Sequence, residues 1–96
     1  MKGCTLAEFI NDLRTMGGPE REFTFREKRY FLETIRQKDT GLLEMYVAEV
    51  VYDSDGPIFR FFGKDFDECT DQFEEAKIFD GQTIYDVEDE IEVLFG

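Results

Sequence analysis

The sequence predicts an α+β fold: an antiparallel three- to four-stranded meander preceded by one helix and followed by two helices. Apolar residues at helical spacing are confined to the two ends of the 96-residue chain, and alternating apolar and polar residues fill its middle. Only short polar turns separate the alternating stretches, and short links join antiparallel neighbours. The length and the lack of a linker indicate a single domain over residues 1–96.

The first helix is expected to begin at a capping box near the N-terminus. Thr5 is followed three residues later by Glu8, so each side chain can accept a hydrogen bond from the backbone N–H of the other. The helix is expected to end at Gly17–Pro19, because glycine and proline terminate helices. Its apolar residues share one face: Leu6, Phe9, Ile10 and Leu13.

Strands and turns are expected in the middle of the chain. Phe23 and Phe25 alternate with polar residues, which is the period of a half-buried strand. Three stretches are rich in turn formers: Glu27–Lys28, Lys38–Gly41 and Asp53–Pro57. The expected strands are the stretch around Phe23 and Phe25, then Arg29–Gln37, Leu42–Tyr52 as the longest, and Ile58–Phe62 as the last.

Two helices are expected after the strands. Asp65 with Glu68, and Thr83 with Asp86, have the spacing of helix caps, and Ile78–Gly81 breaks the pattern between them. The second helix has an apolar face of Phe66, Cys69, Thr70, Phe73 and Ala76. The third has an apolar face of Ile84, Val87, Ile91, Leu94 and Phe95.

Apolar residues occur at both parities of the Leu42–Tyr52 strand, so both faces of the sheet are partly apolar. The favoured arrangement covers one face with the first helix and the other face with the last two. The alternative leaves part of one face exposed as a contact patch.

The composition excludes several classes of protein. Hydrophobic residues make up 42 % of the chain, enough for a core, whereas the net charge of −12 opposes direct binding to nucleic acid or anionic lipid. No apolar run approaches the roughly 20 residues of a membrane span, and no signal peptide is evident. Two isolated cysteines are too few for a disulfide scaffold, so we expect a cytoplasmic protein.

No catalytic set, cofactor motif or metal motif is found. The chain has no histidine, and neither Cys4 nor Cys69 has a CxxC partner, so activated nucleophiles are not expected. Asp53–Gly56 has the acidic spacing of the start of a calcium loop, but it lacks the remaining ligands and favours a polar turn. We therefore expect a protein that is not an enzyme and that needs neither cofactor nor metal.

The excess charge is concentrated in the last third of the chain. Residues 64–96 contain twelve acidic and two basic residues, a net charge of −10 out of −12. Placed on helical wheels, the outward sides of the two C-terminal helices carry seven carboxylates: Asp67, Glu68, Asp71, Glu75, Asp86, Asp89 and Glu90. If the helices are neighbours, these groups form one negative field. They are the candidate partner-binding residues.

Three interpretations of this field remain open. It is a solvated face that serves solubility, a site for a metal or another cation, or a surface that binds a basic groove which normally holds nucleic acid. Like charges along a helix repel one another by roughly 0.2–0.5 kcal/mol per adjacent pair, so the arrangement costs stability in a small domain.

Two stretches resemble segments of small, acidic, uncharacterised proteins of phages and mobile elements of Gram-positive bacteria. They are Arg21–Glu33 (REFTFREKRYFLE) and Phe79–Leu94 (FDGQTIYDVEDEIEVL). In size, acidity and order of elements the chain also resembles phage anti-CRISPR proteins. That second resemblance implies an inhibitor that occupies the DNA-binding cleft of a nuclease, in the cytoplasm of a bacterial host.

The leading hypothesis is an acidic inhibitor whose carboxylates replace phosphates in the nucleic-acid-binding cleft of a host defence protein, as in anti-CRISPR proteins. Its partner is then a basic protein, a nuclease complex, and the inhibitor binds neither nucleic acid nor membrane. The alternative is a small protein-interaction module that uses an apolar sheet face, with acidity serving only solubility.

Overall fold

The computed structural model describes residues 1–15, 20–51 and 56–95. It confirms the α+β class, with two helices and one five-stranded antiparallel sheet in the order β4-β3-β2-β1-β5. The elements are α1 (Leu6–Thr15), β1 (Arg21–Phe25), β2 (Lys28–Arg36), β3 (Leu43–Glu49), β4 (Phe59–Gly63), α2 (Phe66–Glu75), the 3₁₀ turn η1 (Glu88–Glu90) and β5 (Ile91–Phe95).

Helix α1 begins at the predicted capping box. The backbone N–H of Thr5 donates to the Glu8 carboxylate at 3.0 Å, and the N–H of Glu8 donates to the Thr5 hydroxyl at 3.1 Å. The bond from Thr5 lowers the pKa of the Glu8 carboxyl below its ordinary value. All four residues predicted for its apolar face are buried.

Strands β1 to β4 form the predicted meander, with two changes at their ends. The first hairpin turns at Arg26 and Glu27, both at positive φ, rather than at Glu27–Lys28. Strand β3 covers seven residues and is shorter than the nine-residue β2, so Leu42–Tyr52 is not the longest strand. The predicted turn at Asp53–Pro57 lies largely outside the described residues.

The predicted third helix is wrong. Thr83 and Asp86 do bond as a cap, through the Thr83 N–H at 3.1 Å, but only one turn follows before η1 and the strand β5. A helix continued through Glu88–Glu90 would place like charges four residues apart, as at Glu88 and Glu92, where they repel one another. Ile91 instead pairs with Phe25 at the edge of β1, where the extended chain completes the sheet.

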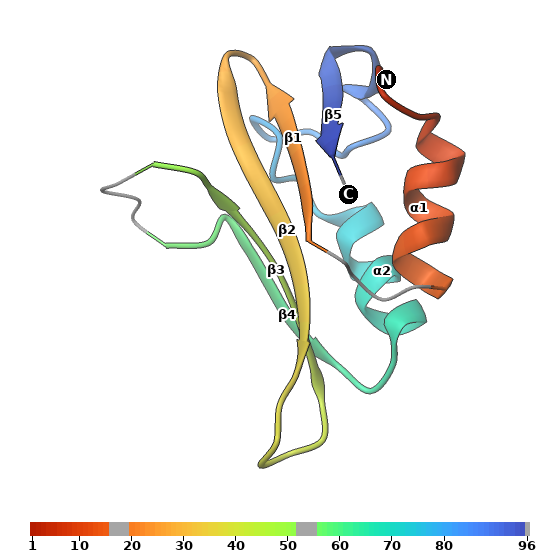
Figure 1. Cartoon of the computed structure of the whole chain (residues 1–96), viewed down its shortest axis with the longest axis vertical. Helices are drawn as coiled ribbons and strands as arrows, with labels where there is room; N and C mark the ends of the chain where they lie inside the picture. Colours follow the sequence, from red (N-terminus) through yellow and green to blue (C-terminus); the bar gives the residue numbers. More distant parts are fainter. Residues whose placement is uncertain (16–19, 52–55, 96) are drawn as a thin grey trace.

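Both helices pack on the same face of the sheet (Figure 1). The favoured arrangement, with helices on opposite faces, is therefore wrong: no described helix covers the outer face. One core cluster lies between the helices and the sheet, and its aromatic centre contains Phe9, Phe23, Phe73 and Phe79. Burial removes these rings from water and provides the main stabilisation of the fold.

No described helix is long and apolar enough to cross a membrane.

Candidate functional site

The seven predicted carboxylates do not lie on two neighbouring helices. Asp67, Glu68, Asp71 and Glu75 lie on α2 as expected. The others lie on a turn and on η1, because the third helix is absent: Asp86, Asp89 and Glu90. The two groups therefore have different surroundings, and each is described separately.

A single arginine of α1 organises the carboxylates of α2. The guanidinium of Arg14 donates to the Asp67 carboxylate at 3.1 Å and to the Asp71 carboxylate at 2.7 Å, and it also bonds Glu74. A further bond reaches the backbone carbonyl of Asp67 at 3.3 Å. These bonds, led by the one from Asp71, raise the pKa of Arg14 above its ordinary value. Helices α1 and α2 are thus joined at the surface by one cation and three anions.

The pairing with Arg14 leaves much of this charge open to water. The side chains of Asp67 and Asp71 are 71 % and 61 % exposed, and Glu75 is exposed with no ion pair among the described residues. We call the four carboxylates Asp67, Asp71, Glu74 and Glu75 the α2 acidic surface. Four anions around one cation keep a net negative charge on it.

Glu68 has a structural task instead. Its carboxylate accepts a hydrogen bond from the backbone N–H of Lys64 at 3.2 Å, and its own N–H donates to Asp65 at 2.8 Å. The predicted cap is confirmed, with the return bond shifted by one residue. Glu68 therefore contributes charge near the start of α2 but is turned toward the backbone.

Tyr85 connects the later segment to the α2 acidic surface. Its hydroxyl donates to Glu74, and this bond raises the pKa of Tyr85 to about 12. Tyr85 lines a hollow of about 480 Å³ together with Asp71, Gln72, Glu74 and Glu75. The hollow is polar and open to water.

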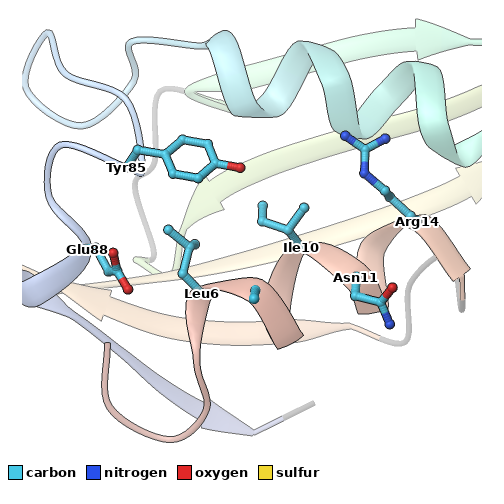
Figure 2. A pocket seen from close by; sticks show the side chains of 7 residues that line it. Leu6, Ile10, Asn11, Arg14, Tyr85 and Glu88 are labelled. Carbon is cyan, nitrogen blue, oxygen red and sulfur yellow. The ribbon is translucent and has the colours of Figure 1, made fainter.

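A second groove runs along α1 beside this hollow. It has a volume of about 470 Å³, and Figure 2 shows Leu6 and Ile10 between Tyr85 and the Arg14 end of the helix. Glu88 lies at its far end. The groove places apolar surface next to the α2 acidic surface, so a partner that enters both meets charge and apolar contact together.

Three carboxylates that follow α2 serve local structure. Glu90 binds the Arg26 guanidinium through two bonds, at 2.8 and 3.0 Å, and Asp80 binds the same group at 2.8 Å. The bond from Arg26 lowers the pKa of the Glu90 carboxyl. Asp86 accepts bonds from the N–H and the hydroxyl of Thr83, both at 3.1 Å.

Asp89 is exposed and has no ion pair among the described residues. Of the three predicted carboxylates that follow α2, it alone has neither an ion pair nor a capping bond within the part of the chain that the structure describes.

Sequence reasoning missed Arg14, Glu74 and Tyr85. Arg14 is the one basic residue of α1, in its last turn, and nothing local indicates that α2 lies beside it. On a helical wheel Glu74 falls toward the apolar side, and the structure places it between the helices at 21 % exposure. Only the packing of α1 against α2 reveals the role of Arg14 and Glu74.

The outer face of the sheet forms a second candidate surface. Ile35 and Phe62 are 41 % and 47 % exposed. Phe31 and Tyr46 form an edge-to-face pair at 5.7 Å, and the Tyr46 hydroxyl donates to Glu33 at 2.6 Å, which raises the pKa of Tyr46 to about 12.

Two ion pairs also lie on this outer face. Arg29 binds Glu22, and Arg60 binds Glu44 at 2.8 Å. In each pair the carboxylate is mostly covered while about half of the arginine side chain stays exposed. The outer face therefore presents apolar groups and guanidiniums, in contrast to the α2 acidic surface.

Neither cysteine has a base beside it in the described structure. Cys69 is buried with its thiol 3.7 Å from the Leu43 carbonyl, and the thiol of Cys4 lies against the sulfur of Met1. Burial raises the pKa of both thiols, which keeps them protonated and weakly nucleophilic.

Neither a family model, nor a curated protein, nor a solved structure matches this chain.

Proposed function

We propose that this protein is an acidic inhibitor that occupies the nucleic-acid-binding cleft of a basic protein, with the α2 acidic surface as its contact. The clefts of bacterial defence nucleases, the targets of anti-CRISPR proteins, are the class of target that this surface fits. The observation that carries the proposal is the row of exposed carboxylates on α2.

The spacing of charge on α2 is close to that of a nucleic-acid strand. Asp67, Asp71 and Glu75, the exposed carboxylates of the α2 acidic surface, follow one another at four-residue intervals, an axial step of about 6 Å at about 1.5 Å per residue. That is close to the spacing of every second phosphate along one strand of DNA, about 7 Å at about 3.4 Å per phosphate. A groove whose arginines and lysines are spaced for phosphates thus meets carboxylates at similar intervals.

Arg14 supports such a role by holding carboxylates in place. Asp67, Asp71 and Glu74 are fixed by one guanidinium before any partner arrives. Side chains that are already ordered lose less conformational entropy on binding. Net negative charge remains, so long-range attraction toward a basic cleft persists and is weakened by salt.

The decisive experiment is affinity capture from a bacterial lysate at low salt, followed by binding measurements on any nuclease that is recovered. The proposal expects nucleic acid to compete with this protein for the captured nuclease, and affinity to fall as salt rises. A gel shift is expected to show no complex between this protein and DNA. A partner that binds DNA and this protein at the same time would contradict the proposal.

A variant pair localises the contact. Asp67→Asn, Asp71→Asn and Glu75→Lys together remove charge from the α2 acidic surface without placing a new cation at Arg14. Close charge pairs in an interface carry coupling of about 1.5–7 kcal/mol, so this variant is expected to lose at least about a hundredfold in affinity. Glu20→Lys with Asp39→Lys makes the same change in net charge at exposed positions elsewhere.

The control pair is expected to bind within a few-fold of the wild type. Equal losses in the two variants would mean that net charge alone matters and that α2 is not a localised site. Thermal melts of both variants check that the fold is intact.

The outer sheet face supports a second candidate function, that of a protein-interaction module. The observation that favours it is the exposure of Ile35 and Phe62 on a face that no described helix covers. Ile35→Asp with Tyr46→Ala, two changes on the outer face, tests it against the first proposal. If these changes abolish capture of the partner while the α2 variant still binds, the sheet face is the site.

A further inference from the structure

The free edge of β4 is the least protected part of the backbone. Strand β4 lies at one edge of the sheet, and no described segment pairs with its outer side. At the opposite end, Lys2 covers part of the outer side of β5: its N–H donates to the Ile91 carbonyl at 3.0 Å, and the Val93 N–H donates back at 2.8 Å. The two edges therefore differ, and only that of β4 is left open.

Strand β4 itself has little of the protection that usually keeps edge strands apart. Its five residues pair with β3 in regular register and include no proline, and Arg60 is their one charged side chain; the irregular bond from the Ile58 N–H to the Val47 carbonyl, at 2.8 Å, lies just before the strand. Three of its five residues are phenylalanine, and Phe62 is 47 % exposed. An unpaired edge rich in apolar side chains is a template for another strand.

Hydrogen bonds of β3 and its flanking residues show which backbone groups of β4 are free. The Val50 N–H donates to the Arg29 carbonyl at 2.8 Å, and the Gln37 N–H donates to the Leu42 carbonyl at 2.7 Å. Because backbone groups alternate sides along a strand, the even-numbered residues of β3 face β2 and the odd-numbered residues face β4.

The same alternation applies to β4. Its odd-numbered residues lie opposite odd-numbered residues of β3, as in the pair Met45 and Phe61, so their backbone groups face β3. The N–H and C=O groups of Arg60 and Phe62 therefore point to the free edge. These two residues provide two donors and two acceptors in a short row.

We propose that a second copy of this chain pairs with this edge, β4 against β4 in antiparallel orientation, with Phe61 at the two-fold axis. In this register Arg60 of each copy lies opposite Phe62 of the other, and their free backbone groups form four N–H···O=C bonds. The two sheets then become one continuous sheet.

Charge selects this register over its neighbours. An axis at Arg60 places two guanidiniums opposite each other, and an axis at Phe62 places Arg60 opposite Lys64 of the second copy. An axis at Phe61 instead places each guanidinium beside a phenyl ring, a favourable cation–π arrangement. Segment 57–64 also contains no carboxylate. Two copies that pair through β4 therefore bring no carboxylates of these strands close to one another.

Assembly stops at two copies and strengthens with salt. Each copy uses its one open edge, and the other edge is partly covered by Lys2, so no strand remains to extend the sheet. The net charge of −12 on each copy opposes association at low salt, and screening relieves it.

Sedimentation of the full chain over a range of concentrations and salt tests the proposal. We expect a monomer–dimer equilibrium that shifts toward dimer with added salt. Phe62→Pro removes an outward N–H that β3 does not use, and proline is tolerated at such an edge position. It is expected to weaken the dimer at least about tenfold without lowering the thermal midpoint of the monomer by much.

The matched control is Ile35→Ser, which removes an exposed apolar side chain from the outer face but not from the edge. It is expected to leave the dimer unchanged. A chain that stays monomeric at every concentration and salt overturns the proposal. A dimer that Phe62→Pro leaves intact overturns it as well, because the contact then lies elsewhere.

A cross-linking pair checks the register. In a background with Cys4→Ala and Cys69→Ala, Phe61→Cys brings two thiols together at the axis, where opposed Cα atoms are about 4.5 Å apart, within reach of a disulfide. Phe59→Cys places its thiols several residues apart in the same register and is expected not to cross-link. Equal cross-linking of the two variants overturns the register.

Discussion

Two acidic stretches of the C-terminal third, α2 and the segment Thr83–Glu90, differ in what their charges do. On α2, Arg14 holds three carboxylates of one exposed helix face, and Glu75 adds a fourth. In the later segment, Asp86 closes a turn and Glu90 binds Arg26, so these two carboxylates have separate local roles. The number of acidic residues in a stretch therefore does not give the charge that its surface presents. A regular helix places its carboxylates side by side on one face, whereas in a turn they are engaged in local hydrogen bonds and ion pairs.

The two stretches also differ in the size of the side chains that anchor them in the core, phenylalanine in α2 and the smaller Ile84 and Val87 in the later segment. Phe73 of α2 has no exposed surface and contacts the rings of Phe9, Phe59 and Phe79 at 5.8–6.4 Å between centroids. Phe73→Ala is expected to lower the free energy of unfolding by about 3–5 kcal/mol, through lost burial and the cavity that remains. Denaturant titration measures it.

Val87→Ala is the counterpart in the later segment, since Val87 is buried to 1 % exposure. It removes two methyl groups and is expected to cost about 2 kcal/mol. If Val87→Ala costs as much as Phe73→Ala, the anchoring of the two stretches does not differ as described.

Arg14→Gln gives the next effect. It leaves Asp67, Asp71 and Glu74 close together without their common cation, and we expect a loss of about 1–2 kcal/mol after allowance for the exposure of the two aspartates. Thermal melts at low and moderate salt measure the loss, which screening is expected to reduce. A loss that grows with salt would show that repulsion among these carboxylates is not its cause.

Tyr85 joins the two stretches, and its bond to Glu74 predicts sensitivity to alkali. Its pKa of about 12 in the folded state exceeds the ordinary value of 10.0, so the folded state holds a proton that the unfolded state releases. This contribution is complete below pH 10 and is lost as pH rises toward 12. Tyr46, bonded to Glu33, has the same shift for the same reason.

Unfolding curves from pH 8 to pH 12 compare the wild type with a variant carrying Tyr85→Phe and Tyr46→Phe. We expect the variant to be less stable at pH 8 and to lose less stability as pH rises through 10–12. Parallel decline of the two proteins would argue against both tyrosine–glutamate bonds.

Arg26→Gln is expected to have the smallest effect. Arg26 and Glu90 are 45 % and 43 % exposed, and water screens such pairs strongly. The lowered pKa of Glu90 means that the pair stabilises the fold above the ordinary value of 4.5 and less as pH falls below it. A melting comparison at pH 7 and pH 4 checks this: the difference between variant and wild type is expected to shrink at pH 4.

Elements with local signals could be predicted from the sequence. The capping box of Thr5 and Glu8, the cap at Asp65 and the alternation around Phe23 and Phe25 each involve residues within a few positions of one another. These signals placed both helices and the first four strands, and they correctly put Cys69 inside the core. Three of the four residues of the α2 acidic surface followed from the same reasoning: Asp67, Asp71 and Glu75.

The third helix shows where local reasoning stops. Ile84, Val87 and Ile91 fit a helical face, but Ile91, Val93 and Phe95 also alternate as a strand does. The cap formed by Thr83 and Asp86 is compatible with both structures. The strand is favoured over the helix because the edge of β1 gains backbone hydrogen bonds from an extended partner. No residue near Ile91 in the sequence indicates that this edge lies beside it.

The sequence by itself determined most of the turns, most of the residues that enter the core and how much negative charge the last third carries, because each of these depends on near neighbours or on composition. Only the tertiary structure decided that both helices share one sheet face, that Arg14 meets α2 and that β4 keeps an open edge. Those outcomes depend on contacts between residues more than fifty positions apart, such as Arg14 and Asp67. They also depend on which segment of the chain pairs with each edge of the sheet.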